Sequence, residues 1–182
     1  MSIMQTRPKQ DHRGNMIKRM MSAAKLDTAV YEEVEADSSA TKQAMAVVVV
    51  VSLATGIGMF RTDGLGGLVV GIPVSIGLWA LWAWITYLIG TTILKTAETE
   101  ANWGQLARTL GFAQSPGVLK VFGFIPGIGP LFFAIASIWQ LVAMVIAIRQ
   151  ALEFTSTWRA VGVAIVGFIP YALIISLIYT FI

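Results

Sequence analysis

Few residues in this sequence could take part in chemistry. The 182 residues include no cysteine and a single histidine, His12, so the chain offers no thiolate nucleophile or thiolate metal site. The serines of the apolar segments, Ser52, Ser75, Ser137 and Ser176, have no histidine near them to act as a base. A hydroxyl in such a helix usually donates to its own backbone. We therefore expect no catalytic residue, no cofactor, no metal site and no enzymatic activity.

Charged residues offer two further candidates. Four acids follow one another closely, Glu32, Glu33, Glu35 and Asp37, and they could bind a cation, although carboxylates on a solvated helix face are usually only hydrated. The apolar segments hold few ionisable groups apart from Lys120. A charge at membrane depth is rare and often functional, and this ammonium group could serve an anion.

The composition indicates a membrane protein. Hydrophobic residues make up 56% of the chain, charged residues 13%, and the mean hydropathy is +0.73, outside the range of ordinary soluble domains. The net charge of +3 would also suit nucleic acid, but the cations are mixed with acids and form no aromatic-lined basic groove. Membrane orientation and anionic lipid explain these charges, so we expect no nucleic-acid partner. The first 40 residues show no apolar core of a signal peptide.

Residues 1–40 are predicted to form a cytoplasmic N-terminal arm with amphipathic helices. After a polar stretch over residues 1–14, apolar residues recur at helical spacing with cations between them. The predicted membrane-surface residues are Met16, Ile17, Lys18, Arg19 and Met20. This pattern suits a helix lying on an anionic leaflet, and it equally suits a helix packed on the protein's own cytoplasmic face. A second short helix is predicted to start at the N-cap Asp27.

Residues 41–182 are predicted to form an all-α, polytopic transmembrane domain of five helices. The approximate crossings are 41–60, 66–90, 116–130, 131–148 and 160–181. The apolar stretch of the second crossing exceeds the roughly 20 residues that span a bilayer, so it must tilt, kink at Pro73 or leave the membrane early. Small and aromatic residues along it form a helix-packing or partner seam, either internal or between protomers: Gly67, Gly71, Ser75, Trp79 and Trp82.

The segment between the second and third crossings carries a helix signal of its own. Asn102 and Gln105 form a capping-box pattern, and the apolar residues that follow share one side of a helix. We expect this helix to lie along the membrane surface, with Gln105 and Arg108 in water.

The third crossing is predicted to be a broken or re-entrant element around Pro126–Pro130. Ser115 and Pro116 begin a helix, but ten residues rise only about 15 Å, and the sequence that follows cannot continue an undisturbed helix. The broken-helix residues are Lys120, Pro126, Gly127, Gly129 and Pro130. Many carriers expose backbone groups to substrate at such a break. The simpler alternative is a proline-glycine turn between two short helices.

The distribution of Lys and Arg sets the orientation. With five crossings, eleven of the thirteen cations lie on the side of the N-terminus, Arg61 lies on the other side and Lys120 is unassigned. If the broken element does not cross, nine cations lie on the side of the N-terminus and three on the other side. Because cations concentrate on the cytoplasmic side, the first arrangement is favoured and the N-terminus is predicted to be cytoplasmic.

Three stretches resemble the YIP domain family of Ypt/Rab-interacting integral membrane proteins, in its prokaryotic branch. They read AAKLDTAVYEEVEADSSATKQA, TEANWGQLARTLGFAQSPGVL and IWQLVAMVIAIRQALEFTSTWRAVGVAIVGF. The resemblance extends over nearly everything after residue 20, and it implies a cytosolic N-terminal segment, five transmembrane helices and a prokaryotic cell membrane. Eukaryotic members bind prenylated small GTPases and shape vesicle traffic, but nothing in this sequence indicates GTPase binding.

These features favour a non-catalytic integral membrane protein that acts by protein or lipid contact. It would serve as a scaffold, an assembly factor or an accessory subunit of a larger membrane complex. The expected partners are membrane lipids and other membrane proteins, or further copies of this chain. The alternative is a small oligomeric transporter or channel that uses the broken helix at Pro126–Pro130.

Overall fold

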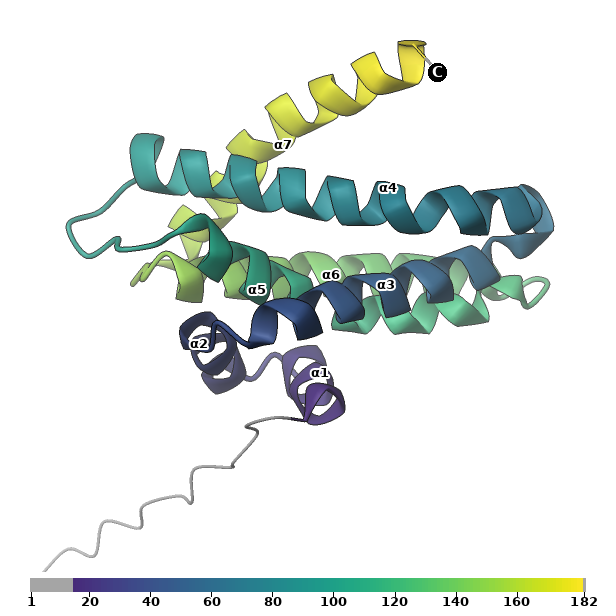
Figure 1. Ribbon diagram of the computed structural model, residues 1–182, viewed down its shortest axis with the longest axis horizontal. Coiled ribbons are helices and arrows are strands. Elements are labelled where there is room, and N and C mark those ends of the chain that lie inside the picture. The colour runs from purple at the N-terminus through teal and green to yellow at the C-terminus, as the bar shows by residue number, and fades with distance from the viewer. Residues whose placement is uncertain (1–14, 182) are drawn as a thin grey trace, which may run out of the picture.

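A computed structural model describes residues 15–181 of the chain (Figure 1). The predicted polar stretch over residues 1–14 lies outside this range. All regular structure between residues 15 and 181 is helical, which confirms the all-α prediction. The helices are α1 (Met16–Ala24), α2 (Thr28–Ala36), α3 (Ala40–Gly58), α4 (Phe60–Leu88), the π-helix η1 (Ile89–Ile93), α5 (Trp103–Ala113), the 3₁₀ helix η2 (Ser115–Phe124), α6 (Gly129–Ala151) and α7 (Thr157–Phe181).

Helices long and apolar enough to cross a membrane make up most of the fold. There are four such stretches among the described residues: Ala40–Gly58, Phe60–Ile93, Gly129–Ala151 and Thr157–Leu177. Large apolar side chains point outward from them, and Leu65, Val69 and Leu173 are among those exposed. An outer surface of this kind requires hydrocarbon around it rather than water, so the chain is a multi-pass membrane protein.

The second long helix begins earlier and ends later than predicted. Helical backbone starts at Phe60 and is interrupted at Gly64, whose φ of 60° lies in the left-handed region that glycine adopts without strain. At the other end a π-helical turn extends the helix to Ile93. There Thr91 Oγ1 donates a hydrogen bond to the carbonyl oxygen of Tyr87 (2.7 Å). The extra length fits the long apolar run in the sequence.

Helix α5 is buried in the bundle and does not lie along its surface. The predicted capping box is present, because Asn102 Oδ1 accepts from the backbone N–H of Gln105 while the Gln105 side chain accepts from that of Asn102. Nevertheless, residues 106–113 are all buried, against α2, α3, α4 and α6. Small residues such as Gly111 let these neighbouring helices approach closely, and the position of α5 relative to the membrane surface stays a prediction.

The 3₁₀ helix η2 continues the path of α5 between α3 and α6. A 3₁₀ helix rises about 2.0 Å per residue and an α-helix about 1.5 Å, so α5 and η2 together extend about 36 Å. The predicted break at Pro126–Pro130 is a turn at the end of the bundle away from α2 (Figure 1). Pro126 and Gly127 are exposed there, and the φ of Gly127 is +83°.

Helices α1 and α2 pack on the flank of the bundle (Figure 1), α1 against α5 and η2, and α2 against α5 and α6. Ala23, Val30 and Val34 are fully buried, and the Tyr31 hydroxyl donates to the carbonyl oxygen of Ala23 at 3.0 Å. Of the two interpretations of the first helix, the structure therefore shows packing on the protein itself.

Candidate functional site

A cavity of about 630 Å³ lies inside the membrane domain, between α3, α4, α6 and α7. It is bordered by the middle parts of α3, α4 and α6, and its volume falls within the roughly 300–1,000 Å³ that small-molecule sites occupy. Most of its lining is apolar. The polar and aromatic side chains that reach it are Ser52, Thr55, Ser75, Trp79, Trp82, Gln114, Lys120, Gln140, Phe168 and Tyr171.

Hydrogen bonds between helices form the polar part of this cavity. Ser52 Oγ donates to Ser75 Oγ at 3.1 Å, joining α3 to α4. Gln140 Nε2 of α6 donates to Gln114 Oε1 at 2.7 Å and to the carbonyl oxygen of Gln114 at 3.2 Å. Gly117 makes room for this contact, since a Cβ there would lie 2.3 Å from Gln140 Nε2. In apolar surroundings such bonds hold their groups firmly in place.

Lys120 reaches the same cavity from η2. The ion pairs found among the described residues belong to Arg19, and no carboxylate of residues 15–181 lies within ion-pair distance of the Lys120 ammonium. An ionisable side chain without a partner at membrane depth is a candidate functional group. The sequence grouped Lys120 with Pro126–Pro130, whereas in the structure it lines the same cavity as Gln114 and Gln140, which no sequence pattern indicated.

The predicted seam on α4 divides into two parts. Trp79 Nε1 donates to the carbonyl oxygen of Ala107 at 3.0 Å, and Trp82 packs edge-on against Tyr171 with ring centroids 5.1 Å apart. The glycine part is open, because a Cβ added at Gly71 would meet nothing within 4 Å and the atoms nearest to one at Gly67 belong to Asp63 of its own helix. The aromatic half thus packs internally, and the glycine half faces outward.

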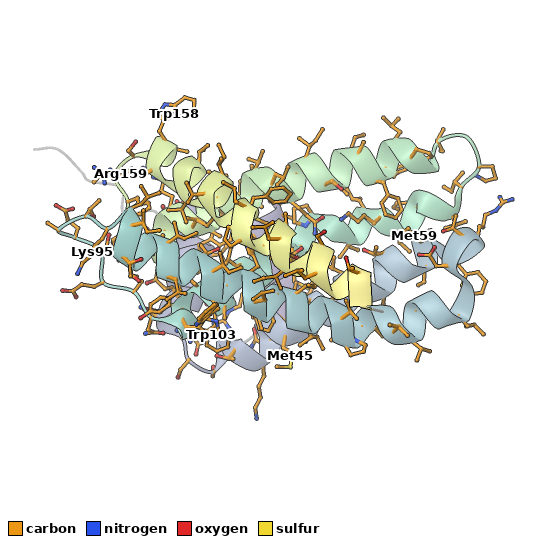
Figure 2. The ribbon with its side chains drawn as sticks, turned by 90° about the horizontal axis from the view of Figure 1, so that it is seen from above. Met45, Met59, Lys95, Trp103, Trp158 and Arg159 are labelled. Atoms are coloured by element: carbon orange, nitrogen blue, oxygen red, sulfur yellow. The ribbon has the colours of Figure 1, made fainter. Side chains whose placement is uncertain are left out.

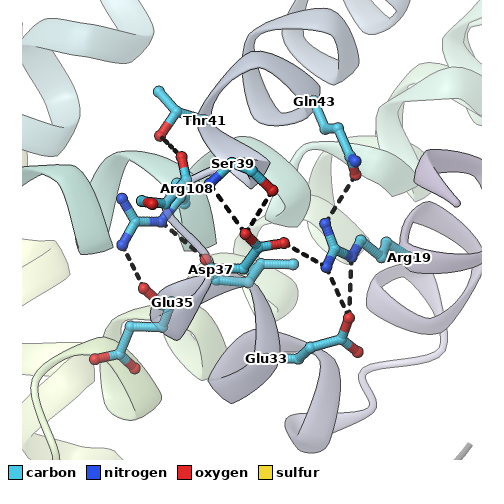
Figure 3. Close-up of polar contacts among 10 residues, drawn as sticks. Arg19, Glu33, Glu35, Asp37, Ser39, Thr41, Gln43 and Arg108 are labelled. Carbon is cyan, nitrogen blue, oxygen red and sulfur yellow. Dashed lines mark hydrogen bonds and ion pairs between the residues drawn. The ribbon is translucent and has the colours of Figure 1, made fainter. Parts of the chain in front are cut away.

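Arg19 anchors α1 to α2 and α3 through buried polar contacts (Figure 3). Its guanidinium Nη2 lies 2.8 Å from Glu33 Oε1 and 2.7 Å from Asp37 Oδ2, and Nη1 donates to Gln43 Oε1 at 3.0 Å. Hydrogen bonds from Ser39, together with Arg19, hold the pKa of the Asp37 carboxyl below its ordinary value.

The five residues of α1 that were predicted to face the membrane therefore differ in their exposure. Arg19 was predicted to face the membrane and is instead 1% exposed, because the acids of α2 supply its counter-charge. Met16 and Met20 are half-buried, and Ile17 and Lys18 are exposed.

A second cleft, of about 580 Å³, lies where α2 meets α5 and the end of α6. Gln105 Nε2 donates to Glu35 Oε1 at 3.0 Å, and Gln150 Nε2 donates to Glu32 Oε1 at 2.8 Å. The Arg108 guanidinium, predicted to be in water, is buried and donates to the backbone carbonyls of Val34 and Glu35 (Figure 3). It thereby satisfies carbonyl groups at the C-terminal end of α2. Within residues 15–181, no three acidic or histidine side chains form a metal site.

The Glu35 carboxyl in this cleft has a raised pKa of about 7. Burial disfavours its charged form, the negative charges of Glu153 and Glu32 act in the same direction, and the positive charge of Arg108 opposes them. Because this pKa lies above the ordinary value of 4.5, the folded state binds the proton more tightly than the unfolded state. The stabilisation is therefore fully present below about pH 4.5 and is lost as the pH rises through 7.

We expect the docking of α2 to weaken between about pH 4.5 and pH 7. Hydrogen exchange of the α2 amides, corrected for the intrinsic pH effect, measures this. Glu35→Gln keeps an acceptor for Gln105 and removes the titrating carboxyl group. In this variant the exchange protection of the α2 amides should therefore change little with pH. Glu98→Gln, at an exposed loop position, serves as the control. An unchanged pH response in Glu35→Gln would assign the effect to another group.

The membrane cavity and the second cleft both lie within a recognised domain. The Yip1 domain matches residues 28–178, from the first turn of α2 into the last turns of α7, and this range includes the residues of both the cavity and the cleft. No curated protein and no solved structure matches the chain. The family match confirms the family that the three sequence stretches resemble, and the prokaryotic branch stays a prediction. The chain therefore belongs to the Yip1 domain family of membrane proteins.

Proposed function

We propose that this protein acts by contact with lipid or protein partners, as a scaffold, assembly factor or accessory subunit of a larger membrane complex. Proteins of the Yip1 family are generally non-catalytic membrane proteins. The observation that carries the proposal is the cavity between α3, α4, α6 and α7. Its mostly apolar walls suit an acyl chain or the side chains of a partner helix, and they present no group of residues arranged for catalysis.

Several buried or half-buried polar groups of the described residues support this interpretation, because they hold the fold together. Arg19 is bound by Glu33 and Asp37. Arg108 donates to the end of α2, and Ser52 bonds to Ser75. A catalytic acid, base or nucleophile must be free to react with substrate.

The proposed topology has five passes with a cytoplasmic N-terminus in a prokaryotic cell membrane. In this arrangement α5 and η2 together supply the third pass, since their length of about 36 Å exceeds the roughly 30 Å hydrocarbon core. In this topology successive helices cross in opposite directions. Figure 2 supports it, because Lys95 and Arg159 lie at one end of the bundle and Met59 lies at the other. The proposal replaces the predicted third crossing at residues 116–130 with residues 103–124.

Two outward surfaces are proposed for contact. On α1, Ile17 and Met21 are 62% and 53% exposed beside the exposed Lys18 and Lys25, a combination that suits the headgroup layer of an anionic leaflet. On α4, the open glycine half of the seam lets a helix of another protein approach closely.

The test is to solubilise the native membrane gently, purify the protein through an N-terminal tag and identify the co-eluting proteins by mass spectrometry. We expect a defined set of partner subunits in stoichiometric amount. Gly71→Leu, on the open seam, should reduce their recovery, whereas Val142→Leu, on the exposed face of α6, should not. Recovery of the protein alone, or only with copies of itself, would contradict the accessory role.

A small oligomeric transporter is the second candidate, and the unpaired Lys120 in the membrane cavity favours it. With the Pro126–Pro130 turn at the end of the bundle, Lys120 with Gln114 and Gln140 would attract the solute. This candidate predicts anion flux in reconstituted liposomes that Lys120→Ala abolishes. Flux no higher than that of empty vesicles would exclude it.

A further inference from the structure

We propose that the cavity binds a single-chain anionic lipid, a long-chain fatty acid, with its carboxylate at Lys120 and its chain along α4, α6 and α7. The inference rests on the proposed function in that it treats the cavity as a site of lipid contact. It adds the chemical class of the ligand and the residue that recognises it.

The hydrogen-bond donors that line the cavity favour an anionic group on the ligand. Lys120 brings a positive charge into the lining, and no carboxylate of the described residues neutralises it. Gln140 donates to Gln114 Oε1, which leaves the side-chain nitrogen of Gln114 as a further donor. A carboxylate accepts from the ammonium group, and a charge-assisted bond of this kind is a strong one. A neutral lipid would leave the ammonium group without a counter-charge.

The remaining lining calls for a hydrocarbon chain. Apolar side chains from all four helices surround the cavity, among them Val48, Leu78, Met144, Val145, Ile165 and Phe168. A chain that leaves the bilayer for this cavity loses no hydrophobic contact and fills space that packed helices leave open.

The position and size of the cavity favour one chain over a phospholipid. A phospholipid carries two chains and a bulky, strongly hydrated phosphate that belongs in the interfacial layer. The cavity lies beside the middle parts of α3, α4 and α6 and holds about 630 Å³. A carboxylate is smaller, and one charged partner satisfies it at lower desolvation cost.

A membrane lipid can reach the site from the side. The cavity is only partly enclosed. Helix α7 packs against α4 where Tyr171 meets Trp82, and beyond that point it diverges from α4 toward its C-terminal end (Figure 1). Entry between these helices needs no opening through the polar ends of the bundle.

The test uses a palmitate that carries a diazirine in its chain, added to the full-length protein in phosphatidylcholine nanodiscs. After illumination, mass spectrometry of peptides locates the label. We expect label on Met144 and Val145. Unlabelled palmitate should compete with the probe and remove this label, whereas methyl palmitate, which has no carboxylate, should not. Lys120→Met should reduce cavity label about tenfold, the effect of losing a charge-assisted hydrogen bond, and Lys120→Arg should retain it. Label on the outward residues Val69 and Val70 serves as the internal control and should not change.

Several results would overturn the inference. These are unchanged cavity label in a Lys120→Met variant that still elutes as a folded protein, equal competition by methyl palmitate, label confined to outward residues, or displacement by phosphatidylglycerol as effective as by palmitate. The last result would assign the site to a phospholipid. If partner subunits co-purify while palmitate leaves the cavity unlabelled, the fatty-acid assignment fails and the contact function stands. If palmitate labels the cavity and no partner protein co-purifies, the fatty-acid assignment stands and the accessory role fails.

Discussion

Gly58→Ala is expected to lower the free energy of unfolding by about 3 kcal/mol, the upper part of the range for overpacking a close contact. A Cβ at this position would lie 2.0 Å from the carbonyl oxygen of Lys120 and 3.0 Å from Phe133 Cε2. A side chain can rotate away from a clash, but the carbonyl oxygen of η2 is part of the backbone. Helix α3 and η2 would have to separate at this point, and their close packing there would be lost.

Gly71→Ala is the matched control for this prediction. It adds the same methyl group to a helix, but at a position where a Cβ meets nothing within 4 Å. Alanine is the better helix former by up to about 1 kcal/mol, so this variant should be as stable as the natural protein or slightly more stable. Thermal unfolding in detergent micelles, followed by tryptophan fluorescence, compares the two. Equal midpoints for both variants would show that α3 and η2 do not approach this closely.

Arg19→Met is expected to release α1 and to destabilise the N-terminal helices by about 3 kcal/mol, the lower end of the cost of removing one partner from a buried ion pair. Arg19 is 1% exposed and joins three helices through Glu33, Asp37 and Gln43. Methionine keeps an apolar chain of similar size and removes the charge. The two carboxylates then face each other without a cation, so repulsion is added to the lost hydrogen bonds.

Limited proteolysis between α1 and α2, with hydrogen exchange of the α1 amides, measures the release. Lys18→Met removes the neighbouring cation from an exposed position of the same helix, and an exposed charge of this kind contributes little to stability. Faster cleavage in Arg19→Met alone is the expected result. If both variants are cleaved as slowly as the natural protein, the apolar contacts of α1 suffice to hold it and the ion pairs do not.

Local signals in the sequence predicted the helices well. The N-cap at Asp27 and the capping box at Asn102 are present, because a capping side chain bonds within two or three residues of itself. The long apolar runs became the four candidate spans. Bilayer thickness and backbone hydrogen bonding leave such a run few alternatives to a helix.

The environment of single polar residues could not be predicted in the same way. Arg108 was expected in water and lies under the end of α2, 73 and 74 residues away from the groups it binds. Arg19 is bound by acids 14 and 18 residues further along the chain. Helical spacing identifies neighbours on one helix, and it contains no information about which other helix will pack against that face.

Membrane insertion, helical class and family thus follow from hydropathy and residue pattern, since they depend on contacts between the chain and its solvent or between near neighbours. The burial of α5, the cavity that Lys120 shares with Gln114 and Gln140, and the role of Gly58 depend on how helices distant in sequence approach one another. In lipid, apolar faces gain little by choosing one neighbour over another. Small residues and a few hydrogen bonds select the packing, and their partners become identifiable only once the helices are assembled.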